Sequence, residues 1–143
     1  MTRAVVLSLI ALFATAWAVA APPAENSALI GQWEANMQGL PFIRLTVEEE
    51  GGKLMGAVLF YLIRRDPGRA PTASPGYPEP MIEPRFDGKT LEFQVCHRFA
   101  HPPRTLNDPP VSFRLELAGP DRIKLFAPEP GQPAVELIRV KYK

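Results

Sequence analysis

Cysteine is almost absent from this sequence, since Cys96 is the only one among 143 residues. No disulfide can form within the chain, so a folded domain must be held together by its apolar core. Histidine is nearly as scarce, with only His97 and His101. A zinc site needs three or four nitrogen or sulfur ligands, so we expect neither a metal nor a cofactor.

An excess of charge of one sign is also lacking. The chain has 16 basic and 15 acidic residues, a net charge of +1. Proteins that bind nucleic acid or anionic membrane surfaces carry a basic patch or a basic excess. The composition therefore predicts no nucleic-acid partner.

Motifs for catalysis are missing as well. The sequence contains no G-x-S-x-G elbow, no phosphate-binding loop and no dinucleotide fingerprint. Cys96 and His97 are neighbours, but adjacent residues of a strand point to opposite faces and cannot pair as nucleophile and base. Ser112 alternates outward on its predicted strand. We therefore name no catalytic residue and favour a binding protein, with an enzyme acting on its ligand as an open alternative.

The N-terminus has the pattern of an export signal. Arg3 precedes the apolar run 4–14, and Ala18-Val19-Ala20 supplies the small-x-small pattern of a cleavage site. A retained membrane helix is the alternative, but the run is shorter than the roughly 20 residues that span a bilayer. We expect cleavage after Ala20, no integral membrane span, and a periplasmic or secreted protein. The absence of any N-glycosylation sequon favours a bacterial source.

The mature chain divides into a short leader and one domain. Residues 21–28 are small, polar or proline and predict a flexible leader, and residues 29–143 are enough for a single domain. Within it, apolar and polar residues alternate in short runs separated by Gly, Pro, Asn and Asp, which is typical of antiparallel strands. There are eight such runs: Ile30–Met37, Phe42–Glu49, Leu54–Arg64, Met81–Phe86, Thr90–Phe99, Val111–Leu117, Arg122–Phe126 and Ala134–Tyr142.

Eight consecutive strands with no helical pattern between them predict an all-β fold. They bury their inner faces either by closing into an up-and-down barrel or by splitting into a sandwich, and closure also removes exposed edges. The simple order favours an eight-stranded antiparallel meander β-barrel. The proline-rich segment Asp66–Pro80 is too irregular for a central strand and is our candidate for a lid.

Two features at the ends of the domain resemble a known superfamily. Gly31-Gln32-Trp33 in the first run resembles the G-x-W signature of the lipocalins and their calycin relatives. In that superfamily a basic residue of the last strand packs across the tryptophan, and Arg139 lies in the last run in phase with Val135 and Leu137. The resemblance implies a lipocalin-like barrel in which Gly31, Trp33 and Arg139 have structural roles.

A lipocalin-like barrel also implies a cup for a small apolar molecule. The interior positions that would line it are Leu45, Val58, Phe60, Phe93, Val95, His97, Phe113 and Leu115. The same residues are compatible with a core filled by side chains, so a hollow and a filled barrel both stay open. His97 is the polar member of the set, and either it binds a ligand head group or backbone and water satisfy it.

The third run suggests a second role. Both of its faces are apolar, and Met55, Leu59, Tyr61 and Ile63 lie on the face away from the predicted interior. An exposed apolar patch of this kind is unusual on a monomer. The alternative function is therefore a protein-interaction module, with a homodimer through these four residues, unless Asp66–Pro80 covers them.

Overall fold

The computed structural model describes residues 26–97, 104–105 and 107–141. The predicted export signal, residues 1–20, lies outside this part of the chain. The last residues of the predicted flexible leader are described, and Asn26–Ala28 form a short 3-10 helix, η1. The Ala28 carbonyl accepts a hydrogen bond from Arg139 at 2.7 Å, so this end of the leader is part of the fold.

The described residues form ten strands. They are β1 (Gly31–Met37), β2 (Leu40–Glu50), β3 (Lys53–Arg64), β4 (Thr72–Pro75), β5 (Glu79–Pro80), β6 (Ile82–Phe86), β7 (Thr90–Val95), β8 (Val111–Gly119), β9 (Arg122–Phe126) and β10 (Val135–Arg139).

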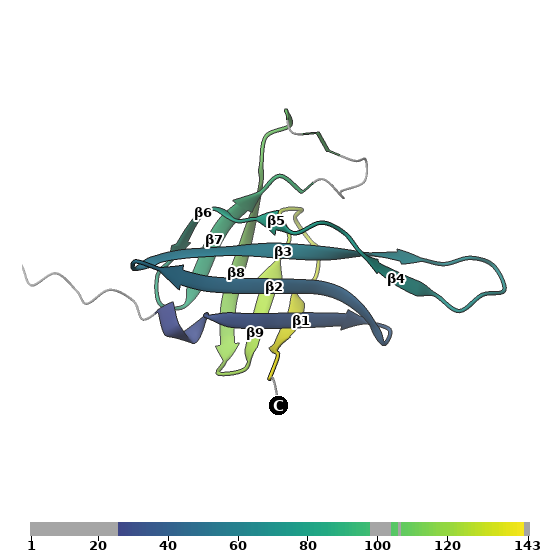
Figure 1. The fold of residues 1–143 in the computed structure, drawn as a ribbon, viewed down its shortest axis with the longest axis horizontal. Coiled ribbons are helices and arrows are strands. Elements are labelled where there is room, and N and C mark those ends of the chain that lie inside the picture. The colour runs from purple at the N-terminus through teal and green to yellow at the C-terminus, as the bar shows by residue number, and fades with distance from the viewer. Residues whose placement is uncertain (1–25, 98–103, 106, 142–143) are drawn as a thin grey trace, which may run out of the picture.

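The strands make one antiparallel sheet that is curled into a half-barrel (Figure 1). Neighbours follow the order β4-β3-β2-β1-β10-β9-β8-β7-β6, with β5 paired to β3 beside this path. The first four strands pair in sequence order from β1 to β4, and the last five pair in sequence order from β6 to β10. The pairing of β1 with β10 joins the two groups. The all-β antiparallel meander predicted from the sequence is therefore confirmed.

The structure has ten strands where the sequence predicts eight. The two additional strands, β4 and β5, lie in the segment Asp66–Pro80 that we expected to be an irregular lid. β4 pairs with the end of β3 from Tyr61 to Arg64, and β5 pairs with Ala57 and Val58 of the same strand. The long edge of β3 supplies their hydrogen-bond partners, so strand pairing is possible in spite of the prolines.

The segment that follows β3 touches both sides of the meander. Glu79 pairs with Val58 of β3, the amide of Met81 donates to the Gly56 carbonyl at 2.9 Å, and Ile82 then pairs with Gln94 of β7. Gly56 permits this close approach, because a Cβ there would clash with the Thr46 carbonyl and lie 3.0 Å from the Met81 sulfur.

Two hairpin turns lie between runs that the sequence predicts as strands. Gly51 and Gly52, between β2 and β3, have φ angles of 58° and 78°, a conformation that glycine adopts without strain. Between β6 and β7, the Asp87 carboxylate accepts hydrogen bonds from the amides of Lys89 and Thr90 at 2.8 and 2.6 Å. These amide bonds, that to Thr90 foremost, hold the pKa of Asp87 below its ordinary value of 3.8.

The inner face of the sheet forms a continuous apolar core. Trp33, Leu45, Leu91, Leu115 and Leu137 are among its fully buried members. Leu62 has the same phase along β3 as Val58 and Phe60, but it lies in the part of β3 that extends past the neighbouring strands and is 39% exposed. β7 ends at Val95, whereas the predicted run ends at Phe99, which lies outside the described residues.

Candidate functional site

An apolar cavity of about 260 Å³ opens at one end of the half-barrel. On β10 it is lined by Val135, four residues from Arg139, which lies at the other end of the same strand. Its walls come from β2, β3, β8, β9 and the segment that joins β9 to β10. Their residues are Phe42, Ile43, Phe60, Tyr61, Leu62, His97, Phe113, Leu125, Ala127, Pro128, Glu129, Gln132, Pro133 and Val135.

Three of the eight predicted ligand-binding residues line this cavity, namely Phe60, His97 and Phe113. The rings of Phe60 and Phe113 lie 6.0 Å apart between centroids. Phe93 stacks on Phe113 at 5.9 Å and is buried, and it does not line this cavity.

The other four predicted residues belong to the packed core. Leu45, Val58, Val95 and Leu115 are fully buried and do not line the cavity. Below the cavity the half-barrel is filled by side chains, because these large residues meet across the curled sheet. A hollow end and a filled end therefore coexist, where the sequence left the two descriptions as alternatives.

His97 is the polar side chain at the aromatic wall of the cavity. Its ring lies 4.5 Å from that of Phe60 and 5.6 Å, edge-on, from that of Phe113. The Nδ1 atom of His97 is 3.4 Å from an Oε2 of Glu79. Because β5 pairs Glu79 with the inward-facing Val58, the Glu79 carboxylate points into the same interior.

Glu79 is the feature that the sequence did not reveal. It is 4% exposed, and it is the one charged residue classed as buried in the part of the chain that the structure describes. Its neighbours Pro78 and Pro80 place it in a segment that we expected to be irregular. No alternation pattern marks it as an inward position, since β5 has only two residues.

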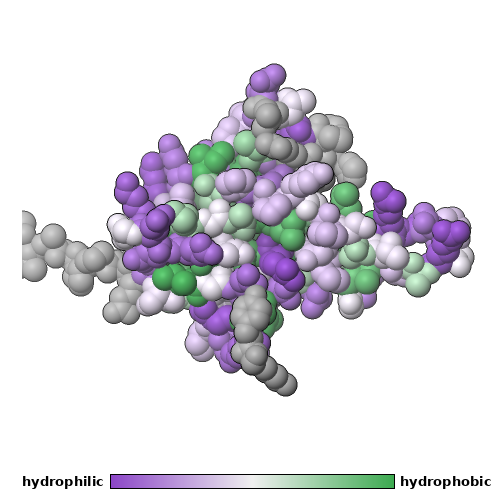
Figure 2. Space-filling view, in the orientation of Figure 1, coloured by the Kyte–Doolittle hydropathy of each residue, from purple (hydrophilic) through white to green (hydrophobic). Residues whose placement is uncertain are grey.

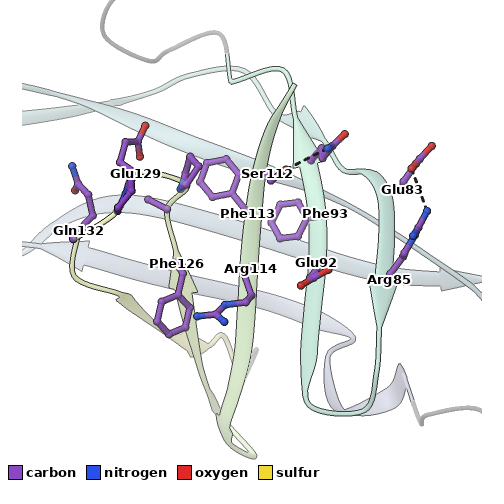
Figure 3. Close-up of a pocket in the computed structure, with 15 residues that line it drawn as sticks. Glu83, Arg85, Glu92, Phe93, Ser112, Phe113, Arg114, Phe126, Glu129 and Gln132 are labelled. Atoms are coloured by element: carbon purple, nitrogen blue, oxygen red, sulfur yellow. Dashed lines mark hydrogen bonds and ion pairs between the residues drawn. The ribbon is translucent and has the colours of Figure 1, made fainter. Parts of the chain in front are cut away.

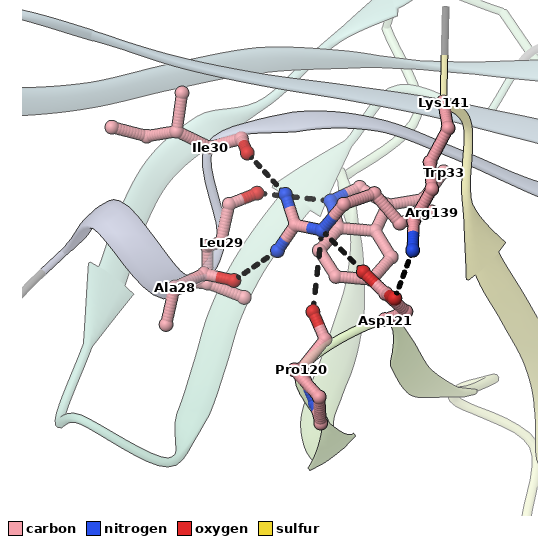
Figure 4. Close-up of polar contacts among 8 residues, drawn as sticks. All are labelled: Ala28, Leu29, Ile30, Trp33, Pro120, Asp121, Arg139 and Lys141. Carbon is pink, nitrogen blue, oxygen red and sulfur yellow. Dashed lines mark hydrogen bonds and ion pairs between the residues drawn. The ribbon is translucent and has the colours of Figure 1, made fainter.

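The opposite end of the half-barrel is closed by Trp33 and Arg139. The guanidinium of Arg139 lies 4.0 Å over the Trp33 ring, within the range of a cation–π interaction (Figure 4). It also donates to the carbonyls of Ala28, Ile30 and Pro120 at 2.7, 2.6 and 3.2 Å. The indole Nε1 of Trp33 donates to the Leu29 carbonyl at 2.9 Å.

Gly31 completes this arrangement. Its φ of 134° is a conformation that side-chain-bearing residues rarely adopt, and a Cβ there would lie 3.0 Å from an Arg139 nitrogen. The structure thus brings together the three residues that the sequence predicts as structural. Asp121 lies beside them, and its hydrogen bond with Lys141, together with the charges of Lys141 and Arg139, holds the pKa of Asp121 below 3.8.

A second hollow, of about 580 Å³, lies on the outer face of β6, β7 and β8. We call it the outer groove. Figure 3 shows its charged walls, with Glu83 paired to Arg85 and Arg114 extending toward Phe126, whose ring centroid lies 4.4 Å from the guanidinium carbon. Its polar groups face solvent and one another, and no buried polar group points into it among the residues that line it.

The predicted dimer surface on β3 is only partly exposed. Met55 is 40% exposed, whereas Leu59, Tyr61 and Ile63 are half-buried, and Tyr61 lines the cavity. β3 and β4 extend past the other strands as a hairpin, and Figure 2 shows hydrophilic residues at its tip. Arg64, Arg65 and Arg69 at this tip are exposed.

Within the described ranges, no three His, Cys, Asp or Glu side chains are placed to hold a metal ion together. The same ranges contain no helix whose length and apolar content would suffice to cross a membrane.

The chain matches no protein-family model, and neither a curated protein nor a solved structure is significantly similar to it.

Proposed function

We propose that this protein binds one small apolar molecule in the cavity between β2, β3 and β8. The observation that carries the proposal is an apolar hollow at one end of an otherwise filled core. Protein interiors are close-packed, so a hollow of this size left among phenylalanines is more typical of a binding site than of a core defect. Its volume is near the lower end of the roughly 300–1,000 Å³ of ligand pockets, which favours a compact ligand.

The barrel itself is proposed to be closed, eight-stranded and lipocalin-like. Support comes from the segment Glu79–Phe86, which pairs with β3 at its start and with β7 at its end. Counting β5 and β6 as one bent strand, and β4 as an addition to the edge of β3, leaves eight strands around the core. The Arg139–Trp33 contact is the feature that the superfamily resemblance implies.

Export to the periplasm or the medium is proposed from residues 1–20. An exported binding protein meets its ligand outside the cytoplasm, where a small apolar molecule is poorly soluble and a carrier is useful. Native mass spectrometry of the protein purified from its own host tests both parts of this proposal.

We expect the mass of residues 21–143 together with a small adduct that is released on denaturation. The matched variant Val135→Phe fills the cavity from β10 and should remove the adduct while the fold is retained. A bare wild-type monomer that also fails to bind apolar dyes would contradict the pocket.

A second function, self-association, is favoured by the projecting hairpin of β3 and β4. Leu62, in the part of β3 that pairs with β4, is 39% exposed, and Tyr77 after β4 is 74% exposed. The outer edge of β4 ends the main path of the sheet, so its backbone groups are available for pairing with a second copy.

Analytical ultracentrifugation tests this second function. If the hairpin forms the interface, Leu62→Glu converts a dimer to a monomer with an unchanged circular dichroism spectrum, whereas Lys124→Glu, on the exposed face of β9, leaves the dimer intact. A wild-type protein that is monomeric at all accessible concentrations rules the interface out.

A further inference from the structure

A buried acidic group, Glu79, contacts the histidine at the aromatic wall of the cavity. Burial of an ionised carboxylate in apolar surroundings is costly unless a partner compensates it. Glu79 is 4% exposed, and His97 Nδ1 approaches it at 3.4 Å. This distance is long for a hydrogen bond, but such bonds in unliganded sites commonly shorten when a ligand excludes water.

The backbone at His97 is held in an uncommon conformation. Its φ is 39°, in the positive range that residues other than glycine seldom adopt, although asparagine, aspartate and histidine adopt it more often than the rest. His97 lies two residues after the end of β7, and its ring packs against those of Phe60 and Phe113. Conformations of this kind concentrate at ligand sites, where the surrounding contacts hold them.

The Glu79–His97 contact decides which hydrogen-bonding role is left for the other nitrogen of the ring. Because a carboxylate only accepts hydrogen bonds, the neutral form of the imidazole has its proton on Nδ1, facing Glu79. The Nε2 atom is then an acceptor. No hydrogen bond to Nε2 is found among the described residues.

We infer that His97 acts as a neutral imidazole and that the cavity binds an amphipathic ligand whose polar group is a hydrogen-bond donor, such as a phenol or an alcohol, with its hydroxyl on His97 Nε2. This inference rests on the proposed function, and it assigns the ligand class for the same cavity. The apolar part of the ligand lies against Phe42, Phe60 and Phe113. Glu79 is a positioning residue that orients the imidazole.

Anionic ligands are disfavoured by the same arrangement. A carboxylate ligand would need a donor at Nε2 and would bring a second negative charge close to Glu79 in a weakly polar interior. Ligands that only accept hydrogen bonds, such as ethers, would leave Nε2 without a partner. The pair therefore discriminates between molecules of nearly equal size by their polar group.

Four probes that share one ring system test the inference: naphthalene, methoxynaphthalene, naphthol and naphthoate. We would measure their dissociation constants with the full-length mature protein by fluorescence or calorimetry. Naphthol should bind about tenfold more tightly than methoxynaphthalene, the effect of one net hydrogen bond of ordinary strength. Naphthoate should bind more weakly than naphthol.

Two variants separate the role of the imidazole from that of the cavity. His97→Phe keeps an aromatic ring and should reduce the naphthol preference to about one while methoxynaphthalene still binds. Phe42→Leu should weaken all probes and leave the preference unchanged. If His97→Phe does not fold, His97→Asn suits the positive φ, and its short side chain should also lose the preference.

The outcomes are distinguishable. If no probe binds the wild-type protein, the proposed function fails, and the inference fails with it. If naphthalene, methoxynaphthalene and naphthol bind equally, the cavity is a ligand site but the assigned ligand class is wrong. Tighter binding of naphthoate than of naphthol, or an undiminished naphthol preference in His97→Phe, also overturns the inference.

Discussion

Arg139 shows how a single side chain can organise one end of a domain. Its guanidinium has an aromatic ring on one side and donates to three backbone carbonyls, two at the start of the domain and one before β9, from segments about 90 residues apart in sequence. An arginine in such a position compensates the desolvation of its own charge and of the carbonyls at once. Trp33 provides the apolar surface, and Gly31 leaves room for the guanidinium.

Replacing Arg139 should therefore be costly. We expect Arg139→Ala to lower the free energy of unfolding by about 3 kcal/mol, since it removes a cation–π contact and leaves backbone carbonyls unsatisfied. Equilibrium unfolding in urea measures the change. Arg122→Ala, at an exposed position of β9, is the matched control and should change stability by less than about 0.5 kcal/mol. Equal effects of the two substitutions would refute a special role of Arg139.

At the scale of the element, the segment Glu79–Phe86 is central because it contacts both β3 and β7. Its position depends on Gly56, where the backbone of β3 lies close to the Thr46 carbonyl and to Met81. A methyl group at this position would force strands apart that are held by hydrogen bonds.

Gly56→Ala should therefore destabilise the protein by about 2 kcal/mol, the usual cost of overpacking a tight site. The comparison variant is Gly119→Ala, because a Cβ there meets nothing within 4 Å. Thermal unfolding followed by circular dichroism should show a lower midpoint for Gly56→Ala and almost none of this effect for Gly119→Ala. A neutral Gly56→Ala would mean that β5 and β6 are not fixed against β3.

Strands with their own alternation could be predicted from the sequence, and strands without it could not. The run that gave β2 alternates Ile43, Leu45 and Val47 with polar residues, and all three are buried. β4 and β5 have no such pattern, since their stability comes from the edge of β3 rather than from their own residues. The same reason hid Glu79 and left the candidate site without its acidic member.

The cavity was predictable only in part. Phe60 and Phe113 follow from the phase of their strands, so the sequence could place them on the inner face. His97 lies beyond the end of β7, and its positive φ is not predicted by strand alternation. Whether an inner residue meets a neighbour or an empty space depends on how strongly the sheet curls and where the β9–β10 connection lies. Pro128 and Pro133 of that connection line the cavity, and no periodic pattern predicts their place.

For the whole molecule, three aspartates couple folding to pH. Hydrogen bonds from amides or side chains lower the pKa values of Asp87, Asp108 and Asp121 below 3.8 in the folded state. The folded state therefore binds these protons less readily than the unfolded chain. The stability they contribute is present at pH values above the ordinary aspartate pKa and is lost as the pH falls through the lowered values.

We expect the melting temperature to fall steeply in acid, from about pH 4 downward. The triple variant D87N, D108N and D121N should have a lower melting temperature at neutral pH and a flatter acid profile. Asp66→Asn, in the exposed loop of the β3–β4 hairpin, is the control and should follow the wild-type profile. A triple variant with an unchanged profile would assign the acid sensitivity to other carboxylates.

Because β1 pairs with β10, the sheet can be completed only after the last strand of the chain has been synthesised. The Arg139 side chain meets the Ile30 carbonyl across a sequence separation of 109 residues, so the first strand emerges from the ribosome long before its last neighbour exists. Contacts at such separations make folding slow. Until synthesis of β10 is finished, one edge of β1 stays open to wrong partners.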